Sequence, residues 1–195
     1  TLLEPLDLVS EPYLVEFDEA RFVKPAGVGA ILQQYLNSGL YLVPTAIDAR
    51  SIVMFGASTL PETDQQAYCS PTIDLPEGSF DEVGYFDVGG GSTTTLTVSG
   101  ISLELSNFTV QGTFSPDGSY FGGGRIIATV DTRPLDILVD EEAKEGYICD
   151  LAAGLGIACL PCPDGGEYCL DLEIDQLYGT AKAAPIVEIE GTNCL

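Results

Sequence analysis

Four of the six cysteines lie close together between residues 147 and 172, and their spacing is compatible with three kinds of chemistry. Cys159 and Cys162 have the C-x-x-C spacing of a zinc site, but a second such pair and any histidine are missing. The same pair has the spacing of a thioredoxin-type redox centre, yet a Pro-Asp-Gly-Gly turn follows it instead of a helix. Structural disulfides are therefore the favoured interpretation for all six cysteines: Cys69, Cys149, Cys159, Cys162, Cys169 and Cys194.

Among the possible pairings, we expect Cys149–Cys159, Cys162–Cys169 and Cys69–Cys194. The first two would make residues 147–172, the cysteine knot region, a staple between a helix and the strand that follows it. The third would tie a long loop to the C-terminal end. Each disulfide is expected to contribute about 3 kcal/mol by restricting the unfolded chain.

Carboxylates are the second group of candidates. Asp171, Glu173 and Asp175 alternate with Leu170, Leu172 and Ile174, so they share one face of a predicted strand. Such a face can offer oxygen ligands to Ca²⁺, although no EF-hand loop is present, and alternate positions can also space a glycosidase pair. With thirty acidic residues in the chain, the favoured interpretation is the solvated polar face of a sheet.

Composition excludes several classes of function. The chain has no histidine, which removes imidazole bases, ligands and pH switches. Its formal charge of −23 repels phosphate backbones and anionic membranes, so nucleic acid is excluded as a partner. Ser58 and Ser92 lie outside any nucleophile motif, and the glycine pattern near residue 27 lacks the third glycine of a dinucleotide fingerprint. No cofactor is expected, apart from the calcium considered above.

The same composition indicates an exported protein. Six cysteines, abundant Gly, Ser and Thr, and a sequence that begins at Thr1 without a methionine favour a processed, disulfide-containing chain. No apolar run is long enough to span a membrane. With 45% hydrophobic residues, the 195-residue chain is predicted to form a single domain with its own core.

The elements that position these residues are mostly strands. Residues 1–12 contain two prolines and are predicted to be an extended N-terminal segment, followed by a short strand at 13–17. Apolar spacing predicts a helix over 25–37, β-branched runs predict a hairpin from 40–47 and 51–56, and the proline-rich stretch 58–82 is expected to be a surface loop.

Residues 84–130 are predicted to form a β-meander. Strands are expected at 85–88, 93–98, 101–105, 107–114 and 119–130, with tight turns at Ser99-Gly100 and Ser115–Gly118. Buried positions change from odd to even numbers near Ser106 and Asn107, which predicts a bulge or bend there. Gly122–Gly124 offers a second bend.

The last third contains the expected helix 141–153, with Asp140 as its N-cap, after a possible helical turn at 134–139 capped by Thr132. Strands are expected at 168–177 and 185–190. The predicted fold is mainly β (α+β): an antiparallel meander, sandwich or bent sheet, with two short helices packed on it and disulfides as staples.

The stretch from residue 101 to 170 resembles a group of uncharacterised exported proteins, often lipid-anchored, of bacteria with a Gram-negative envelope. The resemblance rests on SPDGSYF and the glycines after it, on DTRPL at 131–135, and on ICDLAAGLGIAC followed by PCPDGGEYCL. It implies an extracytoplasmic location, in the periplasm, at the outer surface or secreted, and no particular activity.

Together these features favour a non-enzymatic structural or protein-interaction component of the cell surface or envelope. We expect its partners to be other protein subunits or further copies of itself, held through its N-terminal segment or its sheet edges by strand addition. The alternative is a carrier of a hydrophobic, lipid-like ligand, because bent apolar strands can enclose a cavity. A polysaccharide hydrolase is a distant third.

Overall fold

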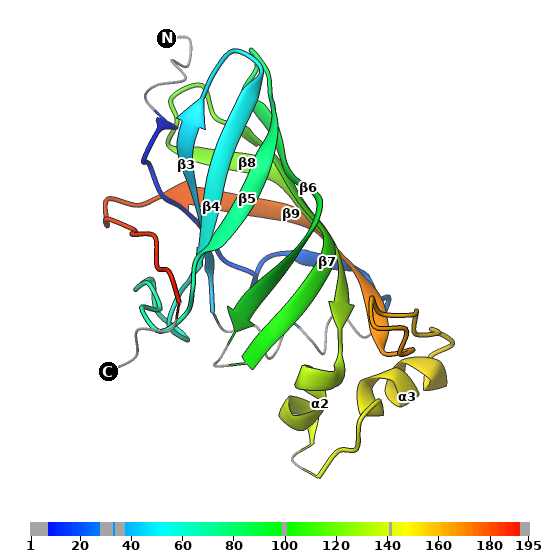
Figure 1. Cartoon of the computed structure of the whole chain (residues 1–195). Coiled ribbons are helices and arrows are strands. Elements are labelled where there is room, and N and C mark those ends of the chain that lie inside the picture. Colours follow the sequence, from blue (N-terminus) through cyan, green and yellow to red (C-terminus); the bar gives the residue numbers. More distant parts are fainter. Residues whose placement is uncertain (1–7, 28–32, 34–37, 99–100, 141, 192–195) are drawn as a thin grey trace.

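The computed structural model describes residues 8–27, 33, 38–98, 101–140 and 142–191 (Figure 1). Strands dominate this part of the chain, which confirms the prediction of a mainly β, antiparallel fold. The elements are β1 (Tyr13–Val15), β2 (Arg21–Lys24), β3 (Leu40–Ile47), β4 (Ser51–Ser58), β5 (Ile73–Phe80), β6 (Tyr85–Val98), β7 (Ile101–Phe114), β8 (Tyr120–Asp131), α2 (Arg133–Val139), α3 (Tyr147–Gly154) and β9 (Cys169–Ala181).

The sheet closes into an eight-stranded barrel, which is more specific than the predicted sandwich or bent sheet. Strands β3 to β9 follow one another in the order β3-β4-β5-β6-β7-β8-β9, and β1 lies between β3 and β9. Leu14 of β1 is in register with Tyr41 of β3 on one side and with Thr180 of β9 on the other. Strand β2 adds to the other end of β9 and lies outside the closed ring.

Aromatic side chains fill the barrel at the end where the β7–β8 turn lies. Phe86, Phe114 and Phe121 are buried, with ring centroids 4.9 to 6.0 Å apart, and Tyr13 of β1 packs against two of them. The Tyr13 hydroxyl donates a hydrogen bond to the Gly118 carbonyl oxygen at 2.7 Å. The short strand β1 is therefore fixed to the turn across the barrel as well as to its two neighbours.

The bend predicted near Ser106 and Asn107 is confirmed. Residues 101–114 form the single strand β7, and Asn107 has a φ of 53° where the register with β8 shifts. This left-handed residue lets Leu105 and Phe108 both point into the barrel. The predicted strands 85–88 and 93–98 are likewise one strand, β6, because Gly89–Gly91 form a bulge and do not end it.

The prediction of a surface loop over 58–82 is wrong for residues 73–80, which form strand β5. Ile73 and Leu75 alternate inward and are buried against β4. The prolines in this stretch suggested a loop, but Pro76 lies at the register shift between the Met54–Leu75 and Ile52–Gly78 pairs. A proline is tolerated at such an irregularity because its missing N–H removes no regular ladder bond.

The helices form a lobe at the opposite end of the barrel (Figure 1). The predicted helical turn at 134–139 is confirmed as α2, although the Thr132 hydroxyl donates to the Tyr168 carbonyl oxygen and does not cap it. The predicted helix 141–153 is corrected to α3, which begins at Tyr147. The buried carboxylate of Asp136 accepts hydrogen bonds from the Gly146 and Ile148 amides at 2.8 and 2.9 Å. Asp136 of α2 therefore caps α3. Asp140, the predicted N-cap, accepts a hydrogen bond from the Glu142 amide within a turn and does not cap a helix.

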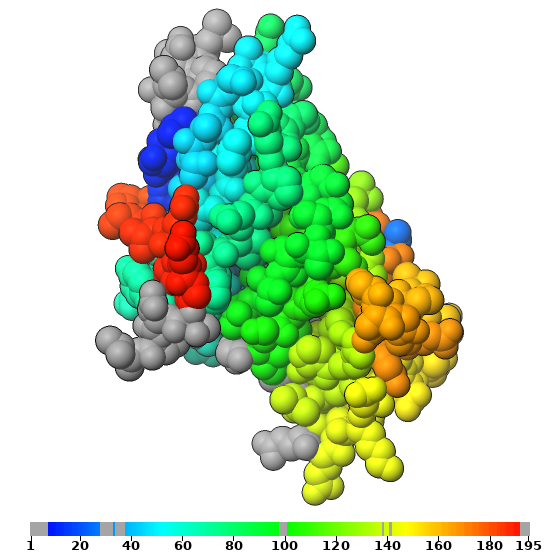
Figure 2. All heavy atoms as spheres, viewed as in Figure 1, coloured from blue at the N-terminus to red at the C-terminus, as the bar shows by residue number. Residues whose placement is uncertain are grey.

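Two further predictions concern the ends of the chain. The strand expected at 168–177 is confirmed as the longer β9, but 185–190 is not a strand. This C-terminal strap lies on the outside of the barrel, drawn in red in Figure 2, and Ile186 packs on an apolar patch that includes Tyr41 and Phe55. Residues 28–32 and 34–37 of the predicted helix 25–37 lie outside the described residues, as do Ser99-Gly100 and residues 1–7 of the N-terminal segment, and residues 25–27 form a bend and turn instead of helix. No helix in the described ranges is long and apolar enough to cross a membrane.

Candidate functional site

The cysteine knot region is a structural staple. The predicted disulfides Cys149–Cys159 and Cys162–Cys169 are both present, and none of the described cysteines is a free thiol. The four sulfurs are therefore not thiolates, which zinc binding or thiol redox chemistry would need. The third predicted pair involves Cys194, which lies outside the described residues, so the Cys69–Cys194 pairing stays a prediction.

The predicted carboxylate face exists on β9, and two of its three carboxylates form ion pairs with basic side chains. Glu173 forms ion pairs with Arg125 at 2.6 Å and Lys24 at 3.1 Å, and Asp175 pairs with Arg21. Hydrogen bonds from these cations lower the pKa of both carboxyls, with Arg125 the largest cause for Glu173 and Arg21 for Asp175. Their negative charge is already balanced by protein groups.

Asp171 completes this face and accepts a hydrogen bond from the Thr129 hydroxyl at 3.3 Å. In the described part of the chain, no group of three or more Cys, Asp or Glu side chains is arranged to hold a metal ion. The face therefore fits the solvated, ion-paired surface of a sheet better than a calcium or glycosidase site.

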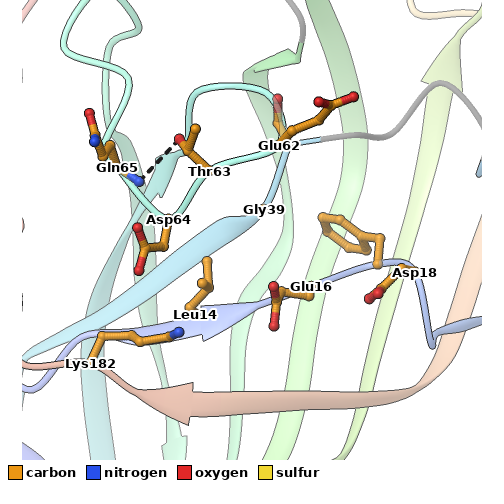
Figure 3. A pocket seen from close by; sticks show the side chains of 11 residues that line it. Leu14, Glu16, Asp18, Gly39, Glu62, Thr63, Asp64, Gln65 and Lys182 are labelled. Carbon is orange, nitrogen blue, oxygen red and sulfur yellow. Dashed lines mark hydrogen bonds between the residues drawn. The ribbon is translucent and has the colours of Figure 1, made fainter.

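Two hollows on the barrel were not found from the sequence. The first, the acidic cleft, has a volume of about 720 Å³ and lies between the segment that follows β1 and the loop that follows β4 (Figure 3). Glu16 and Asp18 line one bank, Glu62 and Asp64 line the other, and Lys182 lies at one end. All four carboxylates are exposed, so water screens their charges, and together they form a negative surface.

A hydrogen bond from the barrel fixes the loop that carries Glu62 and Asp64. The Tyr41 hydroxyl donates to the Asp64 carbonyl oxygen at 2.7 Å, and the pKa of Tyr41 is raised by burial and by the nearby charges of Asp64 and Glu16. Glu62 at the tip has a φ of 57°, an uncommon conformation for a residue other than glycine. A neutral tyrosine thus fixes the loop that presents the acids.

The second hollow, the β5–β6 groove, has a volume of about 530 Å³ and interrupts the barrel wall. Only Ser79–Asp87 and Phe80–Phe86 bring β5 and β6 into register among the described residues. The strands touch at Gly78, where a Cβ would lie 2.0 Å from the Asp87 carbonyl oxygen. Beyond the bulge at Gly89–Gly91, no described residue of β6 is in register with β5. The groove opens there, lined by Cys69, Ser70, Pro71, Thr72, Ile73, Asp74, Thr94, Thr95, Thr97 and Ser102.

Among the described residues, two stretches of strand have no register partner across the groove. Residues 73–78 of β5 pair with β4, and residues 92–98 of β6 pair with β7, but neither stretch is in register with the other. The Thr94, Thr95 and Thr97 side chains on the β6 bank are small and carry hydroxyls. The groove is thus lined by stretches of β5 and β6 that are not paired with each other.

Comparisons with known proteins give no relative. No family model, no curated protein and no solved structure matches the chain. The two hollows and the closed barrel are therefore the features that bear on function.

Sequence reasoning located the staples and the β9 face, but it missed both hollows for a common reason. Each hollow brings together segments that are far apart in the chain: residues 14–18 with 62–65 and 182 in the cleft, and 69–74 with 94–102 in the groove. One local signal pointed to the groove, namely the triple glycine at 89–91 inside a run of β-branched residues.

Proposed function

We propose that the protein is a non-enzymatic extracytoplasmic interaction component that binds an extended segment of another protein in the β5–β6 groove. The observation that carries the proposal is the interruption of the barrel wall, where the edges at 73–78 and 92–98 face each other without pairing. An exposed strand edge is a template for a further strand, and main-chain hydrogen bonds then supply much of the affinity.

Closure of the barrel narrows where strand addition can occur. A closed ring has no outer edges, so another strand can be added at only two places in the described structure: the groove and the free edge of β2. The four-residue β2 ends at Lys24 and carries two basic side chains that are already ion-paired to β9. The groove has the longer edges and the enclosed volume, so it is the better site.

The location rests on the disulfides. Two intact disulfides are consistent with an extracytoplasmic protein, because reducing compartments keep such thiols free. A non-enzymatic role agrees with the lack of histidine in the sequence, since the imidazole of histidine is the commonest general base.

Site-specific photo-crosslinking in the native cell tests this function. Benzoylphenylalanine placed at Thr95 in the groove is expected to give one adduct, and mass spectrometry of the crosslinked peptide should identify an extended segment of a partner. The same probe at Glu167 in the helical lobe is the control. A synthetic peptide of the identified segment should then compete with the adduct. Equal crosslinking at both positions, or none at Thr95 and Thr97, would refute the proposal.

The carrier of a hydrophobic ligand stays a second candidate because the barrel closes. Eight-stranded barrels have an interior that side chains fill or that holds one small ligand. Here the aromatic cluster of Tyr13, Phe86, Phe114 and Phe121 occupies one end, so a ligand would lie in the half nearer α2 and α3. Native mass spectrometry of protein from its source, followed by solvent extraction, should recover a bound lipid if this candidate is right.

A further inference from the structure

We infer that the segment that binds in the β5–β6 groove is basic, with Lys or Arg at alternate positions that face outward. This inference rests on the proposed function and names the chemistry of its partner. It follows from where the few basic side chains of the protein lie, from the acids that border the groove, and from the alternation of side chains along an extended strand.

The basic residues are concentrated away from the groove. Four of the seven form ion pairs around β2, β8, β9 and α2: Arg21, Lys24, Arg125 and Arg133. Arg50 lies in the β3–β4 turn, where its carbonyl oxygen accepts a bond from the Phe80 amide at the far end of β5, and Lys182 lines the acidic cleft. No basic side chain lines the groove.

Exposed acidic side chains lie on the β5 bank of the groove and on β7, the strand beside the β6 bank. Asp74 lines it on the β5 side and Glu77 follows on the same strand, with both side chains exposed. On the β6 side, Thr95 is in register with Glu104 of β7, which is also exposed. None of these carboxylates forms an ion pair within the described residues. The potential at the mouth of the groove is therefore negative.

A strand added between the banks would place every second side chain outward, beside Asp74 and Glu77 of β5, with Glu104 one strand further away beyond β6. Opposite charges on neighbouring strands stabilise a sheet and like charges destabilise it, so Lys or Arg at the outward positions would be selected over Glu or Asp. The inward positions face the apolar residues Ile73 and Leu75 and suit Val or Thr. A second copy of this chain is disfavoured because two molecules of charge −23 repel each other.

The experiment uses a pooled library of nine-residue synthetic peptides. Inward positions are fixed as Val, and three of the outward positions carry Lys, Glu or Ser, as in KVTVKVTVK and EVTVEVTVE. Affinities of fluorescein-labelled peptides are measured by anisotropy, and hydrogen exchange locates the binding site. We expect the Lys peptide to bind about tenfold or more tightly than the Glu peptide and to protect amides at 73–78 and 92–98. The preference should weaken with added salt.

The variant Asp74→Lys/Glu104→Lys should lose this preference and bind the Glu peptide better. The variant Glu142→Lys/Glu167→Lys is the control, because it makes the same change in net charge on the helical lobe and should keep the Lys preference.

The outcomes separate the two proposals. If no peptide of any charge binds with protection at 73–78 and 92–98, strand addition in the groove and the inference both fail. If Glu and Ser peptides bind there as tightly as Lys peptides, the proposed function survives and the basic partner is refuted. If Lys peptides bind but protect only residues 62–65, the acidic cleft is the cationic site and the assignment to the groove is wrong.

Discussion

The close approach of Gly179 to Phe121 makes a quantitative prediction about the barrel core. A Cβ built on Gly179 would lie 2.0 Å from Phe121 Cε1 and 2.6 Å from two further ring atoms. Phe121 itself is 1% exposed and packs edge-on against Phe86 at 5.3 Å and Phe114 at 6.0 Å between centroids. Gly179 therefore provides the space for the ring and is not required by a positive φ.

Gly179→Ala should destabilise the protein by about 1–3 kcal/mol, because the extra methyl group forces the ring out of a well-packed position. Phe121→Ala should cost about 3–5 kcal/mol through lost burial and a cavity. In the double variant the methyl group enters the space that the ring has left. The combined loss should therefore fall short of the sum by about 1–3 kcal/mol, within the range of coupling measured for residues in contact.

Urea unfolding followed by far-UV circular dichroism gives these free energies, and tyrosine emission provides a second probe because the chain has no tryptophan. Gly154→Ala is the matched control. It adds the same methyl group where nothing lies within 4 Å, so stability should stay within about 1 kcal/mol of the parent protein. Additive losses in the double variant, within about 0.5 kcal/mol, would show that Gly179 does not serve the ring.

Three further predictions concern the lobe and the turns. Asp136→Asn weakens the charged cap on the Gly146 and Ile148 amides and should cost about 1–3 kcal/mol, visible as faster hydrogen exchange in α3 with β8 unchanged. Replacing Cys149 and Cys159 by Ala should cost about 2–4 kcal/mol in thermal or urea unfolding, and an unchanged midpoint would contradict the staple. Hydrogen bonds from the Ser115 and Ser119 hydroxyls lower the pKa of Asp117 from 3.8 to about 2. The ionised turn is therefore stabilised above pH about 4 and loses this contribution as the pH falls toward about 2. Ser115→Ala should raise the pKa toward 3.8 in a carboxyl NMR titration, and an unmoved pKa would contradict this cause.

Features that depend on residues close together in the sequence could be predicted from local sequence patterns. The change from odd to even buried positions at Ser106 and Asn107 identified the bend in β7, because side-chain alternation records the face of each residue. Both disulfides within residues 147–172 join cysteines that are close in sequence, 10 and 7 residues apart, as expected. The strands around the β7–β8 turn followed from the turn residues themselves.

Features set by distant contacts were not predictable in this way. The helix α3 begins at Tyr147 because Asp136 of the preceding helix caps it, so the local cap at Asp140 was misleading. Strand β5 depends on burial of Ile73 and Leu75 against β4, which outweighs three nearby prolines. Barrel closure depends on three residues of β1, and the groove depends on where β6 leaves β5; neither has a signature in a single segment.

The position of β1 also constrains how the protein can reach its native state. The ring is completed only when Tyr13 pairs with Ala181, so the wall stays open until nearly all of the described chain is present. A nascent chain cannot form this barrel progressively from its N-terminal side. The last step joins strands from opposite ends of the sequence, and such non-local pairing is intrinsically slow. The free edges of β3 and β9 are therefore expected to stay exposed until β1 pairs with both of them, late in folding.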